Sequence, residues 1–207
     1  MNALVLVDLQ NDFCPGGALA VPHGDEVVAV ANALLRSGRF ARVVATQDWH
    51  PVDHGSFAAN HPGRAPYELG ELAGLPQVLW PAHCVQGTHG AAFRADLDTA
   101  GIDRVFPKGT DAAIDSYSGF FDNGKRKSTG LGEWLRAEGV RELTVLGLAT
   151  DYCVKATALD ARALGFDVTL VEEGCRGVGL GATDVADALA AMRAAGVRIL
   201  SADGAIG

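Results

Sequence analysis

The sequence has little positive charge and no long apolar run, and each absence excludes a class of protein. Its 17 Lys and Arg residues are outnumbered by 25 Asp and Glu residues, which gives a net charge of −8. Nucleic-acid binding needs basic clusters, and the one dense basic run, at residues 125–127, lies in a Gly/Asn turn typical of a solvated loop. No stretch approaches the ~20 apolar residues of a membrane span. We therefore expect neither nucleic acid nor a membrane as a partner.

Cysteine is also sparse, and no two cysteines are arranged as C-x-x-C. This spacing argues against a disulfide framework and against a structural zinc site. The apolar segment at residues 3–7 has no basic residues before it and is too short for a secretory signal. The spacing of the cysteines fits free thiols in a reducing compartment better than disulfides or a zinc site, so we expect a cytoplasmic protein. The four cysteines are Cys14, Cys84, Cys153 and Cys175.

The length and the ordering of apolar segments indicate an α/β protein. A chain of 207 residues, 48% hydrophobic, favours one domain over residues 1–207. Short β-branched runs alternate with amphipathic stretches, which predicts a parallel sheet with helices on both faces, a three-layer arrangement. The predicted strands are 4–7, 42–46, 104–106, 143–148, 167–171 and 197–200, and the predicted helices are 25–35, 131–138, 154–164 and 183–195.

One region interrupts this alternation. Residues 50–90 are rich in Pro, Gly and His and show little periodicity. A loop of that length inside a domain is usually functional or disordered. Its aromatic residues, including Phe57, Tyr67 and Trp80, argue against disorder. We therefore expect a functional loop.

Polar side chains follow four of the predicted strands where each strand ends. They are Asp8 after the first, Asp48 and His50 after the second, Lys108 after the third and Cys153 after the fourth. In an open parallel sheet, ligands bind at the carboxyl ends of the strands. The sequence thus brings an acid, a metal-type pair, a base and a thiol to one edge.

Cys153 has the placement of a nucleophile. It follows a strand and lies in the first turn of a predicted helix, with Thr150 or Asp151 as N-cap. The positive end of the helix dipole favours a thiolate there, and the free N–H groups of that turn are candidates for an oxyanion hole. A buried structural cysteine is the alternative interpretation.

Asp8 and Lys108 could each have a catalytic role or a purely structural one. Asp8 could take a proton from the thiol and return it to a leaving amine, or it could cap a turn. Lys108 could hold Asp8 ionised and stabilise a thiolate, or it could be a surface lysine. The combination with Cys153 is what favours catalysis.

Asp48 and His50 are two residues apart, so in an extended segment both point to one face. His83, from the long loop, could complete a set of three ligands with open positions, which is the pattern of a working metal site. His54 could be a fourth ligand or a partner of a ligand. Zinc, iron and manganese all suit two imidazoles and a carboxylate.

Together these segments resemble the isochorismatase-like cysteine hydrolases, and within them the nicotinamidase/pyrazinamidase group. The resemblance covers nearly the whole chain. Residues 7–13 (VDLQNDF) and 147–154 (GLATDYCV) are shared across the superfamily. Residues 46–51 (TQDWHP) and 80–85 (WPAHCV) point to the group, and 115–120 (DSYSGF) also matches.

The resemblance implies a Rossmann-like fold with a six-stranded parallel sheet and a specific reaction. An amidohydrolase of this group converts nicotinamide and water to nicotinate and ammonia through a thioester, in NAD salvage, and we expect pyrazinamide to be hydrolysed as well. Asp8, Lys108 and Cys153 would form the catalytic triad. The resemblance also implies a cis peptide before Ala149, whose backbone N–H would join that of Cys153 in the oxyanion hole.

The ligand-binding residues follow from the same resemblance. Asp48, His50 and His83 would bind one divalent metal ion, zinc in first place, with iron or manganese as alternatives. The open metal position would meet the pyridine nitrogen. Phe13 and Trp80 would sandwich the ring, with Tyr117 and Ala149 beside it. The expected partner is the small-molecule substrate, and nothing in the sequence excludes a homo-oligomer.

Three other interpretations remain. Hydrolysis of a biuret- or carbamoylsarcosine-type compound would keep the acid, lysine and thiol but generally lack the metal ligands. A non-catalytic binding module would have lost the thiol or the acid, and both are present. A redox sensor at Cys153 would need a resolving thiol next to it in the sequence, and there is none.

Overall fold

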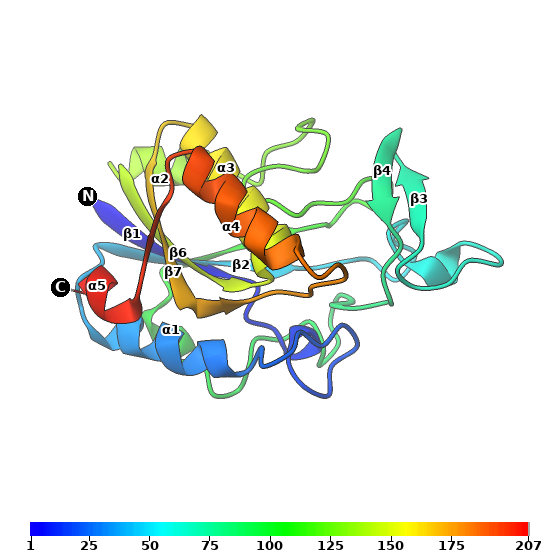
Figure 1. Ribbon diagram of the computed structural model, residues 1–207, viewed down its shortest axis with the longest axis horizontal. Helices are drawn as coiled ribbons and strands as arrows, with labels where there is room; N and C mark the ends of the chain where they lie inside the picture. The colour runs from blue at the N-terminus through cyan, green and yellow to red at the C-terminus, as the bar shows by residue number, and fades with distance from the viewer. Residues whose placement is uncertain (207) are drawn as a thin grey trace.

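The computed structural model describes residues 1–206 and is built around a six-stranded parallel sheet (Figure 1). The strands lie in the order β5-β2-β1-β6-β7-β8. The six predicted strands are all present, and several extend beyond their predicted ends. Their bounds are β1 Asn2–Val7, β2 Arg42–Asp48, β5 Arg104–Lys108, β6 Glu142–Leu148, β7 Asp167–Arg176 and β8 Arg198–Leu200.

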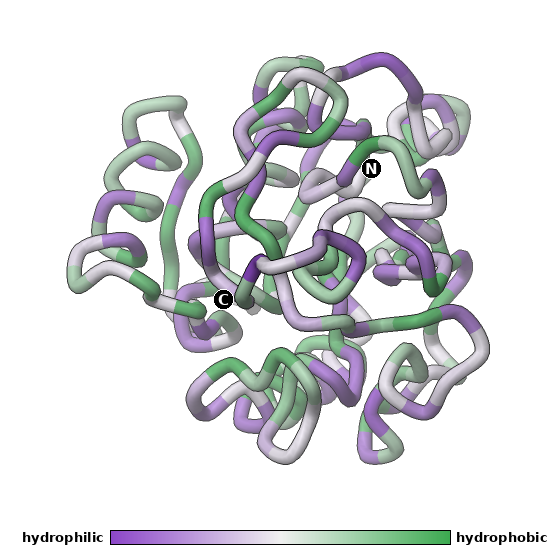
Figure 2. The backbone as a smooth tube through the Cα atoms, turned by 90° about the vertical axis from the view of Figure 1, so that its right-hand side faces the viewer, coloured by the Kyte–Doolittle hydropathy of each residue, from purple (hydrophilic) through white to green (hydrophobic). Residues whose placement is uncertain are grey.

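Helices cover both faces of this sheet, as the alternation of segments predicts. Helices α1 and α5 lie on one face, and α2, α3 and α4 lie on the other (Figure 1). Hydrophobic and hydrophilic residues alternate in short blocks along the helices, as expected when one side of each helix packs on the sheet (Figure 2). The bounds are α1 Glu26–Arg36, α2 Leu131–Ala137, α3 Lys155–Ala163, α4 Asp184–Ala194 and α5 Ala202–Ile206.

The long loop contains a β-hairpin that the sequence did not predict. Strands β3 (Leu69–Leu72) and β4 (Leu75–Val78) pair antiparallel and project from the end of the molecule where the strands of the sheet terminate (Figure 1). Two 3₁₀ turns, Asn11–Phe13 and Ala58–Asn60, lie in the loops after β1 and β2. The loop is therefore ordered, as its aromatic residues indicated.

The chain changes direction between β1 and β6, which are neighbours in the centre of the sheet. From β1 the chain passes through α1 to β2 on one side, and from β6 it passes through α3 to β7 on the other. Ligands of doubly wound sheets bind at such a switch point, beyond the carboxyl ends of the strands. Asp8 follows β1 and Cys153 follows β6, so both flank this point.

The lengths and compositions of the helices also bear on membrane insertion. Within residues 1–206, none combines the length and the hydrophobicity that crossing a bilayer requires.

Candidate active site

Lys108 connects the candidate nucleophile to two carboxylates. Its Nζ lies 2.9 Å from Asp8 Oδ2, contacts Asp48 Oδ1 and donates a hydrogen bond to the Cys153 sulfur at 3.3 Å. The Ser116 carbonyl accepts a further bond from Nζ at 3.0 Å. All the side chains in contact with Nζ are buried. The three predicted triad residues are therefore assembled around one ammonium group.

Burial controls the protonation of this cluster. It opposes a charged lysine, but Asp48 and Asp8 nevertheless raise the pKa of Lys108 well above its ordinary value. Burial raises the pKa of Asp8 and outweighs the effect of the Lys108 charge, which makes Asp8 a stronger proton acceptor than an exposed aspartate. Burial likewise raises the pKa of the Cys153 thiol well above its ordinary value. Burial therefore opposes the thiolate that a position at the start of a helix favours.

The segment that carries Cys153 differs from the predicted helix start. A π-helical turn, η4 (Thr150–Val154), follows β6, and α3 begins only at Lys155. Neither Thr150 nor Asp151 caps this turn with its side chain. The peptide bond between Leu148 and Ala149 is cis, as the resemblance implied. Ala149 thus lies directly before the turn and lines the same pocket as Cys153.

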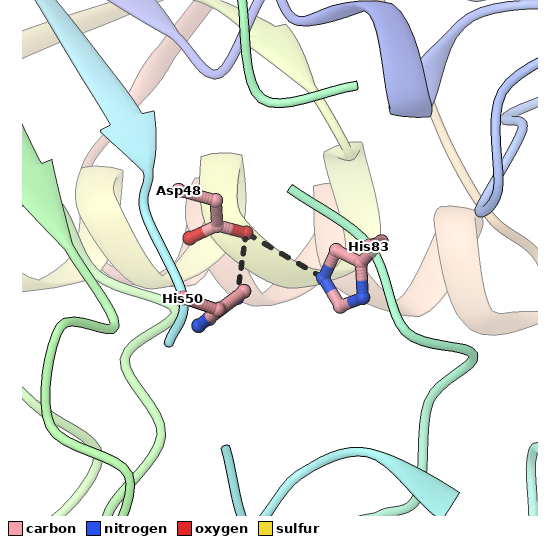
Figure 3. Close-up of side chains that lie close together, drawn as sticks. All are labelled: Asp48, His50 and His83. Carbon is pink, nitrogen blue, oxygen red and sulfur yellow. Dashed lines mark ion pairs between the residues drawn. The ribbon is translucent and has the colours of Figure 1, made fainter. Parts of the chain in front are cut away.

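Asp48, His50 and His83 converge from two separate segments (Figure 3). Asp48 Oδ2 lies 3.5 Å from His50 Nε2 and 3.8 Å from His83 Nε2. One potential ligand atom from each residue lies within 4.8 Å of the others, and all three side chains are buried. The predicted ligand set is therefore brought together by the fold.

The protonation of this cluster fits a bound cation. His50 Nδ1 lies 2.8 Å from the Gly109 carbonyl oxygen, and His83 Nδ1 lies 2.8 Å from the Pro81 carbonyl oxygen. A carbonyl only accepts, so each Nδ1 carries a proton and each Nε2 is left facing the centre, where it would bind a cation once deprotonated. Burial opposes ionisation of Asp48, but Lys108 and His50 hold its pKa well below the ordinary value. Two imidazoles and a carboxylate are a donor set for a divalent metal, which each imidazole would bind through a deprotonated Nε2.

His54 lies beside this set and is oriented differently. Its ring centroid is 4.3 Å from that of His50, and with His50 and Asp115 it forms a second group of side chains close enough to share a metal ion. The Ser56 backbone N–H donates to His54 Nδ1 at 3.2 Å, so Nδ1 accepts and Nε2 carries the proton of the neutral ring. Burial and then the charge of His50 lower the pKa of His54 to about 4. His54 is thus a neutral ring with its Nε2–H without a hydrogen-bond partner among residues 1–206.

One pocket contains both the nucleophile and the metal-type cluster. The carboxylates, imidazoles and thiol in its wall belong to these two clusters and to Asp115. The predicted ring-binding residues line it too. The lining residues are Phe13, Leu19, Asp48, His50, Trp80, His83, Asp115, Tyr117, Ala149, Tyr152, Cys153 and Val178.

Hydrogen bonds fix the aromatic wall of the pocket. Trp80 Nε1 donates to the Tyr117 hydroxyl at 3.1 Å, and the Tyr152 ring meets Trp80 edge-on at a centroid distance of 4.8 Å. Gln77, on β4, donates to the same hydroxyl at 3.2 Å and to Asp115 Oδ2 at 2.8 Å. The hairpin therefore has a function at the site, since it supplies the amide that holds Tyr117 and Asp115.

Several residues of the site were not predicted from the sequence. Asp115 lies in a segment quoted for the resemblance, and Tyr152 adjoins the nucleophile, so each had a weak signal. Gln77, Leu19 and Val178 had none, because a single amide or aliphatic residue in a loop has no characteristic spacing.

Comparison with known proteins gives matches over the full fold. A model of the isochorismatase domain matches residues 2–204. The chain is 54% identical over 200 residues to a nicotinamidase of Escherichia coli (strain K12), covering 96% of this chain and 93% of that protein. The structure of a nicotinamidase/pyrazinamidase of Acinetobacter baumanii is similar with a TM-score of 0.95 and 44% identity, covering 99% of this chain and 97% of the other. A pyrazinamidase of Pyrococcus horikoshii in complex with zinc is similar with a TM-score of 0.79 and 38% identity, covering 97% and 98%.

Proposed function

This chain belongs to the isochorismatase family, and from that premise we propose that it is a nicotinamidase, a cysteine amidohydrolase that converts nicotinamide and water to nicotinate and ammonia. The observation that carries the proposal is the shared pocket: Cys153 opens into the same cavity as Asp48, His50 and His83. An amide hydrolase of the carbamoyl type would need the nucleophile but not this donor set. The high identity to a nicotinamidase supports the same substrate.

We propose that Asp48, His50 and His83 hold one divalent cation, zinc in first place and iron or manganese as alternatives. The zinc complex of the related pyrazinamidase supports this choice. When bound, such a cation supplies a Lewis-acidic contact for the pyridine nitrogen of the substrate. The two backbone carbonyls that accept from the Nδ1 atoms keep both imidazoles in the ligating tautomer.

The aromatic residues orient the pyridine ring for attack. Phe13 and Trp80 contact its faces, and the Tyr117 hydroxyl fixes the plane of Trp80. Holding a reactant in its reacting geometry removes much of the entropic part of the barrier. The carboxamide is thereby directed at the Cys153 sulfur, with Ala149 beside it.

Acylation uses Asp8 as the proton acceptor. The Cys153 sulfur lies within 4.8 Å of a carboxylate oxygen of Asp8. As the sulfur attacks the carboxamide carbon, the thiol proton passes to Asp8, whose pKa is raised by burial. Backbone N–H groups of Ala149 and Cys153 hold the oxyanion, each donor contributing about 3 kcal/mol in sites of this kind. Asp8 then protonates the nitrogen, the C–N bond breaks, and ammonia leaves a thioester on Cys153.

Deacylation reverses the roles. Asp8 takes a proton from water, the resulting hydroxide attacks the thioester carbon, and the C–S bond breaks. The proton on Asp8 returns to the sulfur, and nicotinate leaves. Throughout both steps Lys108 remains an ammonium ion and offsets the negative charge that passes between Asp8 and the sulfur.

Further properties follow from this assignment. Pyrazinamide shares the ring nitrogen and the carboxamide, so we propose that it is hydrolysed too. Residues 1–207 form one hydrolase domain, supported by the span of the family match. Four buried free cysteines support a reducing, cytoplasmic location for an enzyme of NAD salvage.

Product analysis tests the proposal. The zinc-loaded protein is incubated with nicotinamide, and ammonia and nicotinate are quantified beside a Cys153→Ala control. Equal amounts of both products from the wild type and none from the control are expected. A wild type that binds zinc but releases no ammonia would refute nicotinamide as the substrate.

A further inference from the structure

Asp151 is a buried carboxylate that the mechanism above does not use. It lies in η4, two residues before the nucleophile, and only 2% of its surface is exposed. Its Oδ1 accepts from the backbone N–H of Val178 at 2.9 Å, and its Oδ2 accepts from that of Gly179 at 2.8 Å. Hydrogen bonds to a carboxylate are roughly twice as strong as neutral ones. Both oxygens of the Asp151 side chain therefore hold a second loop against the segment that carries the nucleophile.

That second loop, residues 177–183, connects β7 to α4 and is called here the glycine-rich loop (GVGLGAT). Its outer end is tied to the start of α4, where Gly181 N–H donates to Asp184 Oδ2 at 2.7 Å. Beyond the end of β7, the backbone groups of 178–180 make no turn or loop hydrogen bonds within residues 1–206 other than the two to Asp151. Three glycines and few anchors leave this segment free to open when those bonds are lost.

The packing at the start of the loop is built for this contact. A Cβ on Gly177 would lie 3.1 Å from Asp151 Oδ1 and 2.3 Å from a methyl group of Val185. Glycine therefore avoids a clash with Val185 and lets the backbone approach the carboxylate closely. The approach places the next residue, Val178, in the wall of the substrate pocket.

We propose that Asp151 is a positioning residue that latches the glycine-rich loop against the nucleophile segment, so that Val178 closes the pocket and limits it to small, unsubstituted aromatic carboxamides. This inference rests on the proposed nicotinamidase function for its substrate class. The latch itself is a property of the fold. Because Asp151 and Cys153 share one turn, closing the pocket and placing the thiol depend on the same segment.

Hydrogen exchange tests the latch without any substrate. In zinc-loaded Asp151→Ala, the Val178 and Gly179 amides should exchange at least about tenfold faster than in the wild type, the equivalent of losing one charge-assisted hydrogen bond. Amides of β1 should keep their protection. Unchanged exchange at Val178 and Gly179 would overturn the latch, whatever the enzyme hydrolyses.

Kinetics test the effect on the pocket. For Asp151→Ala we expect KM for nicotinamide to rise about tenfold, with a smaller change in kcat. The ratio of kcat/KM for 5-methylnicotinamide or 6-methylnicotinamide to that for nicotinamide should rise by a similar factor. A merely structural residue would lower kcat for all three amides equally, and that result would overturn the assignment of specificity to Asp151. Absence of nicotinamide turnover in the wild type would count against the proposed function and leave the exchange result to decide the latch.

Three further variants separate the causes. Val178→Ala keeps the hydrogen bonds from the loop to Asp151 but removes the side chain that lines the pocket. It should therefore raise the kcat/KM ratio for the methylated amides without faster hydrogen exchange at residues 178 and 179. Asp184→Asn loosens only the outer end of the same loop and should leave the ratio at the wild-type value. Asp151→Asn keeps the side-chain volume and one acceptor oxygen, so it should fold. Its amide exchange rates and its amide ratio should lie between those of the wild type and of Asp151→Ala. A larger ratio change in Asp184→Asn than in Asp151→Asn would contradict the proposal.

Discussion

The ammonium group of Lys108 lies 2.9 Å from the carboxylate of Asp8, and neither side chain is exposed to solvent. The same ammonium also contacts Asp48, from the metal-type cluster. One positive charge therefore balances two buried carboxylates that belong to the two halves of the site. Removing it exposes each of them to the cost of an unpaired buried charge.

We predict that Lys108→Met destabilises the protein strongly. In chelator-treated protein, where no cation compensates Asp48, the free energy of unfolding should fall by about 3–5 kcal/mol, and amidase activity should be lost. Lys125→Met is the matched control, because Lys125 forms an ion pair with Asp160 but is 62% exposed, so its loss should cost about 1 kcal/mol or less. Urea denaturation of both variants measures the difference. Equal losses would show that the buried ammonium has no special role in stability.

The two histidine tautomers lead to a prediction about metal binding. His50 uses Nδ1 for the Gly109 carbonyl and turns Nε2 toward Asp48 and His83, whereas His54 has its Nδ1 occupied by Ser56 and a proton on Nε2. His50→Ala should therefore lose bound zinc and activity, while His54→Ala should retain close to one zinc per chain. Elemental analysis after dialysis against low zinc measures both. Loss of zinc from His54→Ala to the extent seen with His50→Ala would make His54 a ligand and refute the tautomer argument.

Gly109 should be as important for the metal as a ligand is. A Cβ at this position would lie 2.3 Å from the His50 ring, and the Gly109 carbonyl fixes His50 Nδ1. Gly109→Ala should weaken zinc affinity about 10- to 100-fold, the range for losing a ligand's supporting partner. Gly130→Ala is the control, since Gly130 also has a positive φ but open space around its Cα. Both variants carry the backbone strain, so equal zinc affinities, measured by chelator competition, would contradict the steric argument.

The sheet was predictable because each buried parallel strand leaves a short apolar, β-branched run in the sequence. The β3–β4 hairpin was not, since its strands contain Gly70 and Pro76 and bury only one side chain fully, that of Gln77. Residues in such strands show neither apolar periodicity nor β propensity. The π-helical turn at Cys153 was also beyond reach, because a single wider turn does not alter the spacing of apolar residues.

The site was predictable where its residues end strands, and less so elsewhere. Asp8, Lys108 and Cys153 share one edge of the sheet, and that edge follows from the topology. The protonation of Cys153 did not follow, because its pKa depends on how completely the surrounding side chains exclude water. The contacts of Gln77 and Asp151 were missed for a related reason: their partners, Tyr117 and the glycine-rich loop, are distant in the sequence.

The raised pKa values of Asp8 and Cys153 predict how the reactivity of the thiol depends on pH. If Asp8 accepts the proton, alkylation of Cys153 by iodoacetamide in chelator-treated protein requires ionised Asp8. The rate should then fall as pH drops through the Asp8 pKa, which lies above the ordinary 3.8. Above that limb the rate should reach a plateau. It should rise again only above pH 9, where the buried thiol begins to ionise by itself, because its pKa lies well above 9.0.

Asp8→Asn lacks the acceptor, so its rate should be low at neutral pH and lack the acid limb. Mass spectrometry of the Cys153 peptide measures the rate separately from the three other cysteines. A wild-type rate that climbs about tenfold per pH unit from pH 5 to 8, unaltered in Asp8→Asn, would instead mean that a free thiolate reacts without Asp8.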